Sequence, residues 1–74
     1  PMPVENQVAI VYVGSKGLLD KVPTARVGEF EREFLSTLET RHRDVLDAIR
    51  AGKIDDAITG TLERLAAELS GRFA

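Results

Sequence analysis

The side chains that could carry out chemistry are few in this sequence, and the single histidine is the first to consider. His42 is the one imidazole among 74 residues, and the chain has no cysteine. A zinc site takes most of its ligands from histidine and cysteine, so His42 has no such partner with which to complete one. It also lies at helical spacing from Leu38, Val45 and Leu46. We therefore expect His42 to pack at the edge of the core and to make one hydrogen bond.

Serines and two adjacent aspartates are the other residues that could serve a reactive site. Ser15, Ser36 and Ser70 would need a histidine and a carboxylate to become nucleophiles, and a chain with one histidine offers little for that arrangement. Asp55 and Asp56 could be pictured as metal ligands. Two adjacent carboxylates before an apolar run are more typical of a helix start, where they cap the helix and interact with its dipole. The sequence therefore predicts no catalytic, cofactor-binding or metal-binding residue.

One short motif suggests contact with phosphates. The tetrad from Gly14 to Gly17 matches the GXXG loop with which KH domains clamp a nucleic-acid backbone. A KH domain also needs a three-stranded sheet and a basic face, whereas the net charge is −2 and the chain after Pro23 has a helical period. The tetrad does not fit a Walker phosphate loop either, because no Gly-Lys-Ser/Thr tripeptide occurs. We expect no nucleic-acid partner, and a KH-like binder is the less favoured alternative.

Composition defines the class of protein. Of the residues, 43% are hydrophobic and 30% are charged, which is typical of a globular chain with one domain. The longest apolar run, Val8 to Val13, is far shorter than the ~20 residues that span a membrane, so we expect no membrane insertion. Ordering each residue costs roughly 1.5 kcal/mol, so a chain this short needs support from neighbouring structure. Its start at Pro1 and Met2 suggests a piece of a longer polypeptide.

Glycine and proline divide the chain into four predicted helices, and the first contains a conflict. Pro3 suits a first helical position, and Glu5 suits the first turn, where the helix dipole favours a carboxylate. Val8 to Val13 is rich in β-branched residues, which favour a strand. No second strand-like run exists to pair with it, and a lone strand leaves its backbone unsatisfied, so we predict a helix. Gly14 then closes the helix in the left-handed conformation, and Gly17 reverses the chain.

The other three helices show apolar residues at spacings of three and four. The second begins at Pro23, and the third follows it after a bend and ends at Gly52. Asp55 caps the fourth. Glu39 and Arg43 are four residues apart in the order that favours an ion pair. The side chains that we expect in the core are Val8, Val11, Phe30, Phe34, Leu38, Leu46, Ile49, Leu62 and Leu65.

Four segments together resemble a known family. They are PVENQVAIVYVGSKGLLD at Pro3 to Asp20, EFEREF ending at Phe34, TRH at Thr40 to His42 and GKI at Gly52 to Ile54. They are similar to the C-terminal helical domain of the alpha subunit of F-type ATP synthase, and the resemblance covers essentially the whole chain. The related beta subunit carries an acidic, serine-containing signature that is absent here. The resemblance implies an all-α fold, a small helical bundle of about four helices.

The resemblance implies a mechanical role. In this family the alpha subunit is a regulatory, non-catalytic subunit of the rotary, proton-translocating complex that makes ATP from ADP and phosphate. Its nucleotide-binding domain, which binds ATP and Mg, precedes the helical domain. Residues 1–74 would then form a single helical domain, a C-terminal fragment of a longer subunit without catalytic residues. This domain lies near the central stalk and helps to couple rotation to changes in the catalytic sites.

The implied partners are the ATP synthase beta subunits and the gamma subunit of the central stalk, in a hetero-oligomeric ring. The implied location is peripheral, on the cytoplasmic face of the bacterial plasma membrane, with the mitochondrial inner membrane less favoured. A free-standing helical protein-interaction module is the main alternative function. In that case an exposed apolar face of the first or fourth helix would bind a partner helix.

Overall fold

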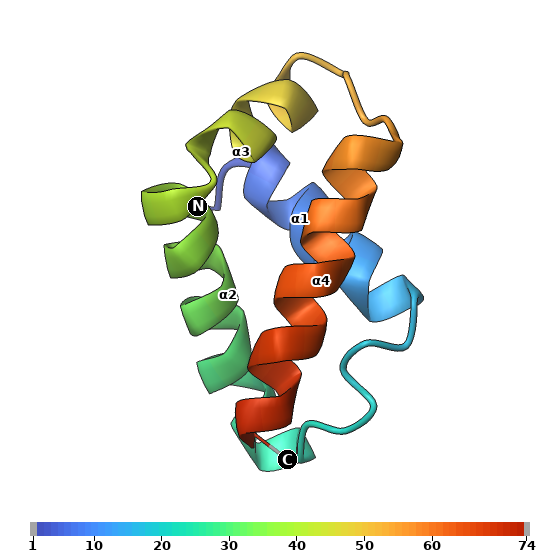
Figure 1. Cartoon of the computed structure of the whole chain (residues 1–74). Coiled ribbons are helices and arrows are strands. Elements are labelled where there is room, and N and C mark those ends of the chain that lie inside the picture. The colour runs from blue at the N-terminus through green and yellow to red at the C-terminus, as the bar shows by residue number, and fades with distance from the viewer. Residues whose placement is uncertain (1, 74) are drawn as a thin grey trace.

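The computed structural model describes residues 2–73, and helices make up most of this part of the chain (Figure 1). The helices are α1 (Val4–Ser15), α2 (Val27–Arg41), α3 (Arg43–Arg50) and α4 (Asp56–Phe73), with a 3₁₀ turn, η1 (Thr24–Arg26), before α2. Residues 2–73 contain no β-strand. The all-α prediction is confirmed, and so is the helical assignment of Val8 to Val13 despite its β-branched composition.

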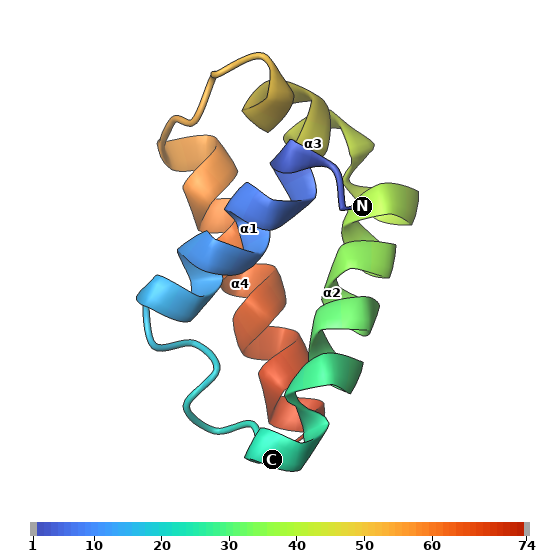
Figure 2. The same cartoon turned by 180° about the vertical axis from the view of Figure 1, so that it is seen from behind.

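The four helices enclose one core. Each of them contacts the other three, and the most extensive contacts join α1 to α3 and α2 to α4. Figure 1 shows α2 and α4 side by side with α3 at one end of the bundle, and Figure 2 shows α1 crossing α4 on the opposite side. The radius of gyration is 11.4 Å, close to the ~11.3 Å expected for a compact domain of this length. The accessible surface is 4626 Å², against about 4500 Å² for a compact monomer of this mass.

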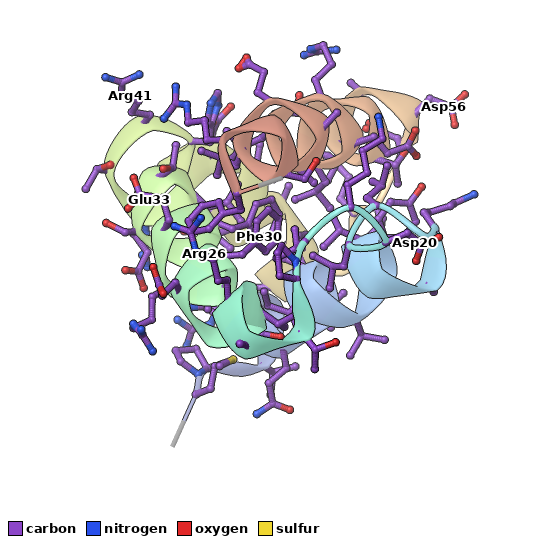
Figure 3. All side chains as sticks on the ribbon, turned by 90° about the horizontal axis from the view of Figure 1, so that it is seen from below. Asp20, Arg26, Phe30, Glu33, Arg41 and Asp56 are labelled. Carbon is purple, nitrogen blue, oxygen red and sulfur yellow. The ribbon has the colours of Figure 1, made fainter. Side chains whose placement is uncertain are left out.

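Phenylalanine rings fill the centre of the core. Phe30 and Phe34 are fully buried and stack with their centroids 5.8 Å apart, while Phe73 meets Phe30 edge-on at 6.0 Å. Figure 3 shows Phe30 in the middle of the bundle with Arg26 beside it. Aromatic pairs at these separations stabilise beyond the area that they bury. The buried apolar side chains are Ala9, Val13, Val22, Phe30, Phe34, Leu38, Val45, Leu46, Ile49, Leu62, Leu65, Ala66 and Leu69.

Two of the predicted core residues lie elsewhere, and both belong to α1. Val8 is half-buried and packs against the rim of the core, whereas Val11 is 67% exposed. The prediction for Val11 is therefore wrong. Ala9 and Val13 take the fully buried positions on this helix, because α1 is rotated about its own axis relative to the predicted orientation.

Glycines in the left-handed conformation end α1 and α3. Gly17 has φ of +73° and Gly52 has φ of +82°. At the end of α1, the amides of Gly17 and Leu18 donate to the carbonyls of Gly14 and Val13. At the end of α3, the amides of Gly52 and Lys53 donate to the carbonyls of Ile49 and Ala48. This pattern is the Schellman motif, which satisfies the last free carbonyls of a helix. The prediction that Gly14 closes α1 is wrong by three residues, because Gly14 still lies within the helix.

A single non-helical residue separates α2 from α3. His42 has φ of −133° and ψ of 44°, which breaks the helix between the second and third predicted helices, where the sequence predicts a bend near Thr40 to Arg43. The break also changes the ion pairs. Arg43 bonds to Asp47 at 3.5 Å, and Glu39 instead accepts a hydrogen bond from Asn6 of α1 at 3.2 Å. The expected Glu39 to Arg43 pair does not form, because the break turns Arg43 away from the face of α2 that carries Glu39.

The second helical segment begins with a 3₁₀ turn where the sequence predicts an α-helix. The sequence predicts helix from Pro23, whereas the structure has η1 first and begins α2 at Val27. The amide of Arg26 donates to the Pro23 carbonyl at 2.8 Å, which is a 3₁₀ contact. Arg26 places its guanidinium 4.5 Å from the ring centroid of Phe73, at the end of α4. This cation–π contact joins η1 to the end of α4.

Candidate functional site

Helix α1 departs from the usual arrangement because it buries two polar residues and exposes two valines. A surface helix normally buries an apolar stripe and exposes polar residues. In α1, Glu5 and Asn6 are buried, with 7% and 5% of their surface exposed. Val4 and Val11 are 71% and 67% exposed. Large exposed apolar groups are the informative exception at a protein surface, and α1 concentrates them on one side.

The exposed apolar side of α1 is continuous along the helix, and we call it the α1 outer face. Its residues follow one another at spacings of four, three and four, which places them on one side of an α-helix. Its central part is an open depression of about 430 Å³. The face consists of Val4, Val8, Val11 and Ser15, with Gln7 and Tyr12 at its edges.

Polar contacts fix how α1 is rotated about its axis. On the inner side, Asn6 Nδ2 donates to Glu39 Oε2 of α2 at 3.2 Å. At the edge of the outer face, the Tyr12 hydroxyl donates to Glu63 Oε2 of α4 at 2.5 Å. Lys16 Nζ lies 5.6 Å from the centroid of the Tyr12 ring. Because these bonds reach two different helices, they fix the rotation of α1 that leaves Val4 and Val11 exposed.

The contact with Glu63 also changes the acidity of Tyr12. The hydrogen bond to the Glu63 carboxylate, and to a lesser degree desolvation, raises the pKa of Tyr12 above its usual value of 10.0. The neutral phenol is the form that donates to the carboxylate, so removing its proton would break the bond between α1 and α4. Tyr12 therefore acts as a neutral structural group at physiological pH.

The α1 outer face is the best candidate for an interaction site in the described residues. Covering one exposed valine would contribute roughly 1 to 2 kcal/mol, since full burial of such a side chain contributes about 1.5 to 3 kcal/mol. A helix that is apolar on all sides is typical of a position buried on all sides. The sequence signal for this site is the unbroken apolar run from Val8 to Val13. A helix in this fold packs only one of its sides against the core, so part of such a run stays exposed.

The residues considered for nucleophilic chemistry remain separate. Ser15 Oγ donates to the Tyr12 carbonyl at 2.8 Å, and Ser70 Oγ donates to the Ala67 carbonyl at 3.1 Å. Ser36 is exposed on α2, and His42 is half-buried at the break between α2 and α3. Within residues 2–73 no hydrogen bond links a serine to this histidine. Ser15 and Ser70 thus bond to the backbone of their own helices.

The acidic pair and the glycine tetrad have structural roles. Asp55 Oδ1 accepts a hydrogen bond from the amide of Ile58 at 3.0 Å, which confirms Asp55 as the cap of α4. Asp56 lies in the first turn of that helix. In the part of the chain that the structure describes, no three histidine, cysteine or acidic residues are grouped closely enough to hold a metal ion. Gly14 to Gly17 ends α1, and the lack of any strand within residues 2–73 contradicts the KH alternative.

Comparison with known protein families identifies the family of the chain. Residues 1–69 match the family described as ATP synthase alpha/beta chain, C terminal domain. The chain belongs to this family. The resemblance seen in the sequence is thereby confirmed, and the fold of four helices without strands in residues 2–73 is the one that the resemblance implies. No solved structure matches the chain. None of the helices within residues 2–73 has the length and hydrophobicity that crossing a membrane requires.

Several members of this family are similar along the whole of the chain. Over 73 residues it is 53% identical to ATP synthase subunit alpha of Christiangramia forsetii and 52% identical to that of Flavobacterium johnsoniae. Each alignment covers 99% of the chain and 14% of the relative. The alignment with ATP synthase subunit alpha of Syntrophomonas wolfei is 45% identical and covers 100% of the chain and 15% of the relative. The chain therefore spans a small part of the length of these relatives.

Proposed function

We propose that the chain acts as the C-terminal helical domain of an ATP synthase alpha subunit. That subunit is a regulatory, non-catalytic part of the rotary complex that makes ATP from ADP and phosphate with a proton gradient. The observation that carries this proposal is the family match over residues 1–69 together with 53% identity to an alpha subunit over 73 residues. The chain then forms one domain behind the nucleotide-binding region of a longer subunit, and that region binds ATP and Mg.

The role of the domain in this proposal is mechanical. It packs in a hetero-oligomeric ring with the beta subunits, near the gamma subunit of the central stalk, and helps to convert rotation into changes at the catalytic sites. A body that transmits motion has to be stiff. The mutual contacts of the four helices and the buried stack of Phe30 and Phe34 support this role. No residue of the chain takes part in the chemical step in this proposal.

The proposed location follows from the parent complex. The alpha subunit is peripheral on the cytoplasmic face of the bacterial plasma membrane in this proposal, and the similar subunits named above come from bacteria. The surface of the domain therefore meets other subunits and water, and the lipid contacts belong to other parts of the complex.

Exchange of the domain tests the proposed function. In the Flavobacterium johnsoniae alpha subunit, the matching C-terminal part is replaced by these 74 residues and an affinity tag is added. We expect the chimeric subunit to co-purify with beta and gamma subunits. The matched control carries Phe34→Ala, which removes the central ring of the core, and should lose this association. A folded chimeric subunit that retains neither beta nor gamma would contradict the proposal.

A free-standing helical interaction module is the second candidate function. The observation that favours it is the α1 outer face, where Val4 and Val11 are exposed. This function predicts that the isolated chain binds a partner helix without any preceding domain. Failure of the chimeric subunit to assemble, together with concentration-dependent association of the isolated chain in sedimentation, would favour this alternative.

A further inference from the structure

We draw no further inference here: the strongest candidate, the α1 outer face with its open depression of about 430 Å³, is an exposed apolar helix surface, and nothing in the structure of residues 2–73 shows what covers it.

Discussion

Truncation of Phe34 gives the sharpest test of the core. Its side chain is fully buried and stacks on Phe30 with the ring planes 10° apart. Phe34→Ala removes the ring from a closed interior and leaves a cavity that the surrounding helices fill only in part. Substitutions of this type cost about 3 to 5 kcal/mol. A domain of this length has a total stability of only about 4 to 11 kcal/mol, so the variant should lose a large share of it.

The stability lost in Phe34→Ala corresponds to a large decrease of the melting temperature. Unfolding entropies near 2.1 cal/mol/K per residue give roughly 155 cal/mol/K for this chain, so a loss of 4 kcal/mol lowers the melting temperature by about 26 °C. The assay is thermal unfolding followed by circular dichroism at 222 nm. Val11→Ala is the control, because its side chain is 67% exposed. It should change stability by less than about 0.5 kcal/mol, or ~3 °C.

Two results would refute this reasoning. If Phe34→Ala melts within about 5 °C of the parent chain, the phenylalanine stack does not form the core. If Val11→Ala is as damaging as Phe34→Ala, the rotation of α1 is wrong and its outer face is buried. Urea unfolding of both variants checks that the differences come from stability, since a surface substitution should leave the slope of the transition unchanged.

The remaining predictions concern glycines and the tyrosine. Gly60→Ala should stabilise α4 by about 1 kcal/mol, or ~6 °C, because a Cβ there meets only the Arg64 side chain at 3.7 Å; a lower melting temperature would contradict this. Gly52→Ala should instead destabilise by about 1 to 2 kcal/mol in the same melt, since φ of +82° disfavours alanine in otherwise open space. Ultraviolet titration should give Tyr12, the single tyrosine, a pKa above 10.0 that Glu63→Gln moves back toward 10.0. Because the folded-state pKa is the higher one, this contribution to stability is complete below pH 10 and is lost as the pH rises through the folded pKa.

The parts of the fold that the sequence predicts are those with one apolar side. In α2 and α4 the large apolar residues form a single stripe and the other positions are mostly charged, polar or small, so burial has one solution. The predicted core residues Phe30, Phe34 and Leu62 are all buried. The cap at Asp55 was predictable for a similar reason, because a carboxylate before a helix has few competing roles.

The rotation of α1 was not predictable from its apolar pattern. Apolar residues occur on all its sides, so periodicity does not select an inner face. The selection is made by polar partners that are distant in sequence. Asn6 bonds to Glu39, and Tyr12 bonds to Glu63. These pairings become visible only when α2 and α4 are in place, and they turn Val11 outward.

The choice between two glycines at the end of α1 was also beyond the sequence. Gly14 and Gly17 can both adopt positive φ at little cost. The Schellman bond from Leu18 to the Val13 carbonyl selects the later one, because it lets Leu18 return to the core with Val13 already buried there. The energy of that tertiary contact decides where the helix ends.

ATP synthesis by the domain-exchanged enzyme tests the central claim most directly. Inverted membrane vesicles are prepared from cells whose alpha subunit carries these 74 residues in place of its own C-terminal part, and the rate of ATP formation is measured under a proton gradient. The account predicts a rate comparable to the parent enzyme and a rate near zero for a subunit truncated at the same junction. An assembled chimeric complex that makes no more ATP than the truncated control would contradict the claim that this domain couples rotation to catalysis.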